Sequence, residues 1–140
     1  MAFSPETYAL LNNKIDGVKN IAEDKGTVFN GVNNGGSAIS VGSSFKNVNE
    51  IELEAGTYLI NGAVGFSGNL DSSKVIQLSL YDVTNAATIA TVRGTAGLGG
   101  GVSMSMIVTH DAKTKYRFRA AQNTGSDLST GENLMFAVKL

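Results

Sequence analysis

From residue 27 to its end, the chain consists of short runs in which apolar and polar residues alternate, separated by turns rich in glycine and asparagine. Alternation with a period of two is typical of a β-strand with one buried face. The sequence has 17 glycines and one proline, and short strands between such turns predict a mainly β sandwich or barrel. The expected strands are Thr27–Val32, Ala38–Val41, Asn47–Glu54, Thr57–Ser67, Lys74–Val83, Thr88–Gly94, Val102–Thr109, Lys115–Gln122 and Asn133–Leu140.

The composition excludes several classes of partner. The net charge is −1, with acidic and basic residues interspersed, so we expect no nucleic-acid and no membrane partner. The chain has no cysteine, which excludes disulfides and thiolate metal sites. We predict no signal peptide and no membrane span, because no basic region precedes an apolar run and no run approaches about 20 apolar residues. Charged residues make up only 16%, which indicates that part of the surface faces other protein.

The first 26 residues predict a helix that precedes the β-domain of residues 27–140. Ser4 suits an N-cap, Pro5 the first helical position and Glu6 the positive end of the helix dipole. The helix either packs on its own domain, forms a bundle with its copies, or docks on a larger structure. Its apolar residues recur at spacings of three and four, as in a heptad seam, and are Tyr8, Leu11, Ile15, Val18 and Ala22.

One apolar face of each main strand is expected to form the core of the sandwich, because side chains alternate across a strand. The predicted core residues are Ile51, Leu53, Tyr58, Ile60, Val64, Phe66, Ile76, Leu78, Leu80, Val102, Met104, Met106, Val108, Tyr116, Phe118, Ala120, Leu134, Phe136, Val138 and Leu140.

The reverse faces of three strands carry no charge before Lys139. These are Thr57–Ser67, Val102–Thr109 and Asn133–Leu140. An antiparallel sheet exposed to water on one side is expected to be polar there, so another copy of the chain is the simplest cover for these faces. The alternatives are that the N-terminal helix lies across them, or that they are ordinary scattered apolar residues on the surface.

Two other strands have charged reverse faces of opposite sign. We expect these strands to be neighbours, because opposite charges at facing positions stabilise a pair of strands by roughly 0.2–1 kcal/mol each. The alternative is two unrelated solvated faces. The residues are Glu50, Glu52 and Glu54 on one strand and Lys115, Arg117 and Arg119 on the other.

Four segments resemble the tumour-necrosis-factor-like and complement-first-component-like jelly rolls. They are Glu50–Phe66, Ile76–Ile89, Met106–Gly125 and Leu134–Leu140, and the likeness covers about residues 27–140. The resemblance implies an antiparallel jelly-roll homotrimer whose inner sheet forms the interface. The residues expected at that trimer interface are Leu59, Ala63, Ile107, Met135 and Ala137.

The opening residues 1–17 resemble the start of small structural proteins of tailed bacteriophages. The resemblance implies a virion protein, such as a head fibre, a capsid decoration or a fibre tip. Its helix would bind a capsid or tail protein, and its jelly roll would contact cell-surface glycan. The alternatives are a secreted or spore-surface trimer of a bacterium and a stand-alone carbohydrate-binding domain.

No motif for catalysis, a metal or a cofactor is present, so we expect a non-enzymatic protein with none of these sites. His110 is the only histidine and is expected to be a solvated turn residue. The alternative is a metal site formed by three copies on a threefold axis. The turns at Asp71 and Asp127 lack the ligand spacing of a calcium loop.

Overall fold

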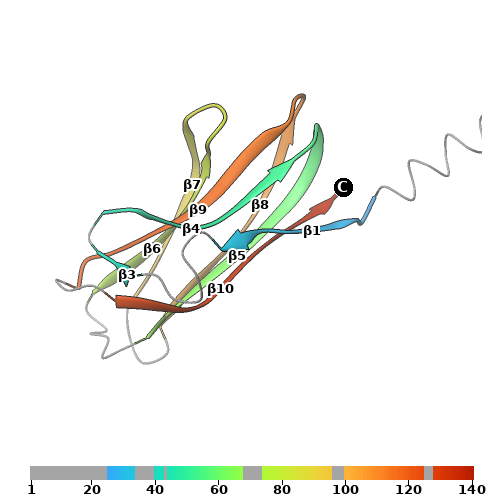
Figure 1. The fold of residues 1–140 in the computed structure, drawn as a ribbon. Coiled ribbons are helices and arrows are strands. Elements are labelled where there is room, and N and C mark those ends of the chain that lie inside the picture. The colour runs from blue at the N-terminus through green and yellow to red at the C-terminus, as the bar shows by residue number, and fades with distance from the viewer. Residues whose placement is uncertain (1–24, 34–39, 43, 68–73, 96–99, 125–127) are drawn as a thin grey trace, which may run out of the picture.

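A computed structural model describes residues 25–33, 40–42, 44–67, 74–95, 100–124 and 128–140. Within these residues the protein is a sandwich of two antiparallel sheets, five strands in each (Figure 1). The described residues contain no helix that is long and apolar enough to cross a membrane. The helix predicted for residues 1–26, with its seam from Tyr8 to Ala22, lies almost wholly outside the described residues.

Sheet A has the strand order β1-β10-β5-β8, with β3 also paired to β10. Sheet B has the order β2-β4-β9-β6-β7. Every pairing in both sheets is antiparallel. The strands are β1 (Val28–Asn30), β2 (Val32–Asn33), β3 (Ser40–Val41), β4 (Lys46–Leu53), β5 (Gly56–Ser67), β6 (Val75–Asp82), β7 (Ala87–Thr95), β8 (Gly101–His110), β9 (Thr114–Gln122) and β10 (Leu128–Lys139).

All nine predicted runs are strands, with two differences at the ends of the domain. The first run is divided into β1 and β2 at Gly31, where the chain passes from sheet A to sheet B. A Cβ at Gly31 would lie 2.8 Å from the Cβ of Met135, so this crossing requires glycine. The last strand begins at Leu128 instead of Asn133, because the pairing continues across an irregularity between Thr130 and Asn133.

The prediction that the acidic and basic strands are neighbours is confirmed. In the pairing of β4 with β9, Glu50 faces Arg117 and Glu52 faces Lys115. The Nε of Arg117 donates to the Oε2 of Glu50 at 3.0 Å. Glu52 and Glu54 form ion pairs with Lys113 of the β8–β9 turn, at 3.3 and 3.4 Å, and these contacts raise the pKa of Lys113.

The two sheets are in direct contact where Phe118 of β9 meets Gly62 of β5. A Cβ at Gly62 would lie 2.1 Å from the Cε2 of Phe118, so the ring fills the space that a side chain at position 62 would take. Phe118 is fully buried. The predicted core residues of β4, β5, β6 and β9 are all buried around it, and those of β8 are buried or packed against the core.

The prediction that the stripe from Leu134 on β10 to Leu140 faces the core is wrong. Leu134 is 52% exposed, whereas Met135 and Ala137 are 3% and 0% exposed. Phe136 and Val138 share the outer face with Leu134, and Leu140 is exposed. Both stripes of this strand are apolar, and the irregularity after Thr130 reverses which stripe points inward. The smaller Ala137 and the flexible Met135 therefore lie beside Gly62 and Ile60 in the core.

We expect Gly62→Ala to destabilise the fold by at least about 2 kcal/mol, because overpacking of a filled core typically costs about 1–3 kcal/mol. The matched control is Gly131→Ala, where an added Cβ meets no atom within 4 Å and the change should stay within about 0.5 kcal/mol. Urea unfolding of both variants at one protein concentration measures the difference. Equal stability of the two variants would show that the contact with Phe118 relaxes freely.

A candidate interaction surface on sheet A

The outer face of sheet A carries a row of apolar side chains that crosses all four main strands. Val28 of β1 faces Val138 of β10, Val138 faces Leu59 of β5, and Leu59 faces Ile107 of β8. Val28 is 55% exposed and Ile107 is 61% exposed. Because the members of the row are paired neighbours, they form one continuous apolar strip.

The next row on this face mixes polar and aromatic side chains but still has no charge. It runs from Asn30 through Phe136 and Asn61 to Ser105. The Oγ of Ser105 donates to the Oδ1 of Asn61 at 2.6 Å, so the polar groups of this pair bond to each other. Their pairing lowers the penalty for covering the row with another molecule.

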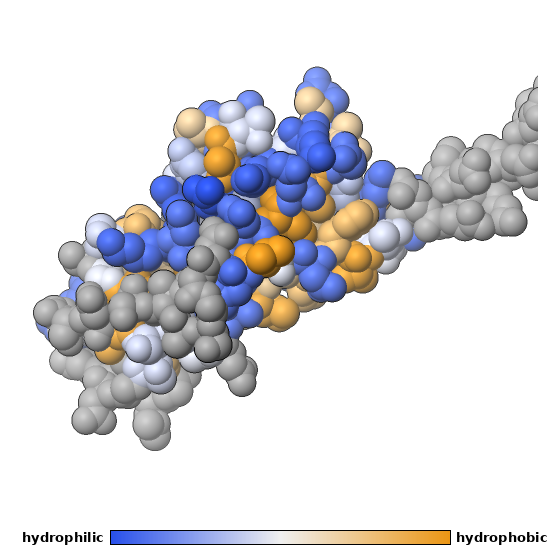
Figure 2. All heavy atoms as spheres, viewed as in Figure 1, coloured by the Kyte–Doolittle hydropathy of each residue, from blue (hydrophilic) through white to orange (hydrophobic). Residues whose placement is uncertain are grey.

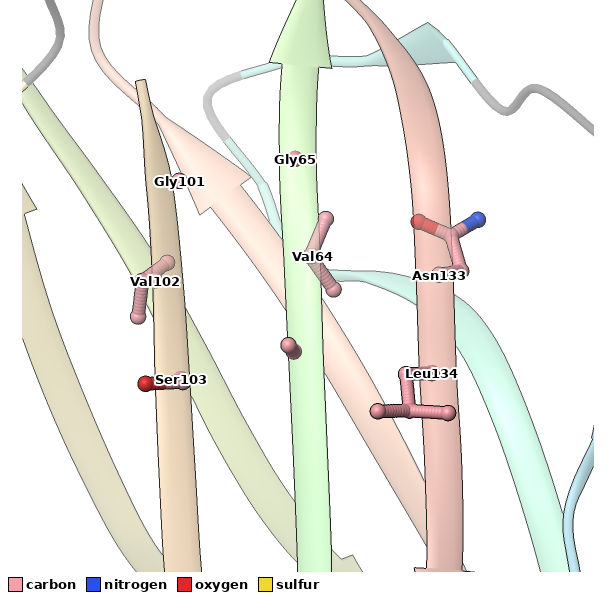
Figure 3. A pocket seen from close by; sticks show the side chains of 8 residues that line it. Val64, Gly65, Gly101, Val102, Ser103, Asn133 and Leu134 are labelled. Atoms are coloured by element: carbon pink, nitrogen blue, oxygen red, sulfur yellow. The ribbon is translucent and has the colours of Figure 1, made fainter. Parts of the chain in front are cut away.

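A shallow hollow lies on the same face beyond these rows, with a volume of about 550 Å³. Figure 3 shows its lining on β5, β8 and β10, where the side chains are small or absent at Gly65, Gly101 and Ser103. The Oδ1 of Asn133 is buried there without a hydrogen-bond partner, while its Nδ2 donates to Thr130 at 3.1 Å.

We call the outer face of sheet A, from the row of Val28 to this hollow, the sheet A face. Its regularly paired side chains include no charged residue. Figure 2 shows hydrophobic atoms beside β1 and the end of β10, next to a hydrophilic area over β4 and β9. Large exposed apolar patches mark interaction sites, so this face is the candidate functional surface.

The structure brings three of the five predicted interface residues to this face: Leu59, Ala63 and Ile107. Met135 and Ala137 are buried inside the sandwich and cannot contact a partner, so their prediction is corrected. The same face instead carries residues that the sequence reasoning had assigned to the core. They are Leu134, Phe136 and Val138.

No protein-family model matches the sequence, and no curated protein matches it either. Solved structures that resemble the fold include two with TM-scores above 0.5. Eiger TNF from S. frugiperda aligns with a TM-score of 0.53 at 12% identity, over 83% of this chain and 93% of the other. The VP2 subviral particle of infectious bursal disease virus aligns with a TM-score of 0.54 at 12% identity, over 83% of this chain and 33% of VP2. The chain has a jelly-roll fold.

These identities establish the fold of the jelly roll and nothing about its partners. The chain spans about a third of the VP2 chain that it matches. A carbohydrate-binding module from Cellvibrio mixtus lichenase 5A, solved with cellotriose, aligns with a TM-score of only 0.36 at 17% identity, over 85% of this chain and 93% of the module. That value is too low to support an argument.

One end of the jelly roll holds a cluster of side chains around His110 that the sequence did not predict. The ring of His110 stacks on Tyr58 with the centroids 5.4 Å apart and the planes 7° from parallel. Its Nε2 donates to the carbonyl oxygen of Glu54 at 2.8 Å, and its Nδ1 accepts from the hydroxyl of Tyr116 at 2.9 Å. The prediction of a merely solvated histidine is therefore wrong.

Both ring nitrogens of His110 are already engaged in hydrogen bonds, so neither offers a free lone pair to a metal. Among the described residues no group of three or more histidine or acidic side chains is placed to hold a metal ion. Glu54 and Tyr58 are distant from His110 in the sequence, whereas Tyr116 follows it on the next strand, so no single local pattern identified the cluster. This cluster closes one end of the core.

Alkaline pH should destabilise the jelly roll through Tyr116. Burial, and secondarily the charge of Asp82, raises the pKa of Tyr116 to about 12 from 10.0. The folded state holds this proton more tightly than the unfolded state does. The contribution of Tyr116 to folding stability is therefore complete below about pH 10 and is lost as the pH rises through about 12. The free energy of unfolding, measured with urea over this pH range, should fall more steeply for the wild type than for Tyr116→Phe. Parallel losses in the two proteins would assign the effect to other groups.

Proposed function

We propose that the protein is a non-enzymatic structural and adhesion module, a homotrimer of jelly rolls on a bacteriophage virion. The sheet A face is the single observation that carries the proposal, because an isolated chain would leave this uncharged surface in water. The module would serve as a head fibre, a capsid decoration or a fibre tip. The resemblance of residues 1–17 to phage structural proteins supports this placement.

Self-association explains the sheet A face better than a small ligand does. The face extends over four paired strands and the hollow on it is open to solvent, whereas sites for small molecules are usually concave and enclosed. Stable interfaces bury about 800 Å² on each partner, and a sheet face of four strands offers an area of this kind. Most soluble oligomers contain identical chains, so sister subunits are the proposed cover.

Ile107→Lys should dissociate the assembly. The substitution places a charge at an exposed position on the edge strand β8 of the sheet A face, and burying an unpaired charge costs several kcal/mol. We expect the dissociation constant of the oligomer to rise at least about 100-fold. The matched control is Ile89→Lys on β7 of sheet B, because Ile89 is also exposed, at 38%, and lies away from this face.

Native mass spectrometry and light scattering at micromolar concentration measure the mass of each protein. A wild-type mass of three chains, kept by Ile89→Lys and lost by Ile107→Lys, is the expected result. A wild-type protein that is monomeric at this concentration would end the proposal of self-association. A stable mass of two chains would replace the trimer by a dimer.

The N-terminal residues are proposed to attach the jelly roll to a capsid or tail protein of the virion. Deletion of residues 1–25 retains Gly26, whose N–H donates to the carbonyl of Lys139 at 2.7 Å, so the β-domain should fold as before. The truncated protein should keep its oligomeric mass and fail to join virions when supplied to a phage that lacks its own copy. Incorporation at the wild-type level would refute the anchoring role.

A further inference from the structure

The outer face of sheet B holds an arginine between two aromatic rings. Arg119 of β9 has its guanidinium carbon 4.0 Å from the ring centre of Tyr81 and 5.6 Å from that of Phe45. Tyr81 belongs to β6, and Phe45 immediately precedes β4. Stacking of this kind fixes the plane of a guanidinium and removes water from its faces.

Among the described residues, no acidic side chain forms an ion pair with Arg119. Its neighbour Arg117 is paired with Glu50 at 3.0 Å, and Lys113 is paired with Glu52 and Glu54. Within the described part of the chain, Arg119 makes no hydrogen bond and no ion pair. Its Nε is buried without a partner, so the two Nη groups at the end of the side chain remain available to a ligand.

The two positions paired with Arg119 are polar and uncharged. Asn47 faces Arg119 on β4, and Ser79 faces it on β6. One pair further along β6, Gln77 lies between Ala121 and the exposed Arg93. The surface near Arg119 therefore combines positive charge with amide groups and with the partly exposed ring of Phe45 (39%).

We propose that Arg119 binds the carboxylate of an acidic sugar, such as a sialic or uronic acid, at the end of a cell-surface glycan. A fixed guanidinium presents two parallel donors that match a carboxylate, and the buried Nε restricts the approach to the two Nη groups. Asn47 and Gln77 supply amides for sugar hydroxyls, and Phe45 supplies an apolar edge. The inference rests on the adhesive role proposed above, but it does not require the trimer.

The site lies on the sheet opposite to the sheet A face, so association of subunits leaves it exposed. A trimer would present three copies of it, and a glycan-covered surface would bind them together with higher avidity than one site provides. Weak binding at each site is therefore compatible with firm attachment.

Calorimetric titration with sialyllactose, its carboxyl methyl ester and lactose tests the site in the full-length protein. We expect sialyllactose to bind at least about tenfold more tightly than either neutral sugar, because hydrogen bonds to charged groups contribute about 1.5–3 kcal/mol. The comparison with the methyl ester needs no variant, so it holds even where a substitution disturbs folding. Equal affinity for the acid and its ester would overturn the proposal.

Two substitutions and one control assign the binding to Arg119. Arg119→Gln and Arg119→Lys should each weaken sialyllactose binding at least about tenfold, since lysine keeps the charge but loses the planar pair of donors. Lys113→Gln removes the same charge from a paired cation and should change the affinity less than about twofold. Wild-type affinity in Arg119→Lys, or an equal loss in Lys113→Gln, would assign the effect to net charge instead.

The same titration on Ile107→Lys separates this inference from the proposed function. A dissociated subunit should keep the per-site affinity, because Ile107 lies on the other sheet. A protein that proves monomeric but distinguishes the acid from its ester would retain this site and lose the trimer. A trimer that treats both sugars alike would lose the site alone.

Discussion

The contact between Phe118 and the backbone of Gly62 determines how the two sheets fit together. The ring takes the space where a side chain of β5 would point inward, so the central strands of sheets A and B lie close at this point. On the neighbouring strand β10, Met135 and Ala137 flank the contact. A short or flexible inward side chain fits there, and Leu134, Phe136 and Val138 point to the outer face of sheet A. The stripe of β10 that does not point into the core thus forms part of the apolar outer face of sheet A.

The two sheets have outer faces that suit different surroundings. Sheet B exposes a ladder in which Glu50 faces Arg117, and such exposed pairs contribute little to stability but disfavour a shifted register. The sheet A face has no such charges, and its register depends on apolar neighbours such as Leu59 and Ile107. Water covers the first face without penalty, whereas the second gains free energy when another protein surface covers it.

The sequence predicted the features that follow from alternation within one strand. It did not predict the contacts that form between several segments of the chain. The nine strands, most of the core and the pairing of Glu50 with Arg117 follow from a period of two. The inward face of β10 did not follow, because both of its stripes are apolar and the irregularity after Thr130 changes their phase. The rings that stack on His110 and Arg119, Tyr58 and Tyr81, lie on strands that are distant in sequence, so only the folded arrangement brings them together.

Charged side chains lie on the outer face of sheet B and not on the sheet A face. The proposed contacts between subunits and the proposed ligand site therefore use different surfaces. A substitution on the sheet A face would act on the proposed contacts between subunits, while Arg119 lies on the opposite side of the core. Sites without shared partners usually contribute independently, so the ligand specificity of one face can change without loss of the assembly. A sandwich with one uncharged and one charged face therefore suits the proposed adhesive oligomer, in which one surface would be buried by other copies and the other would stay exposed to a ligand.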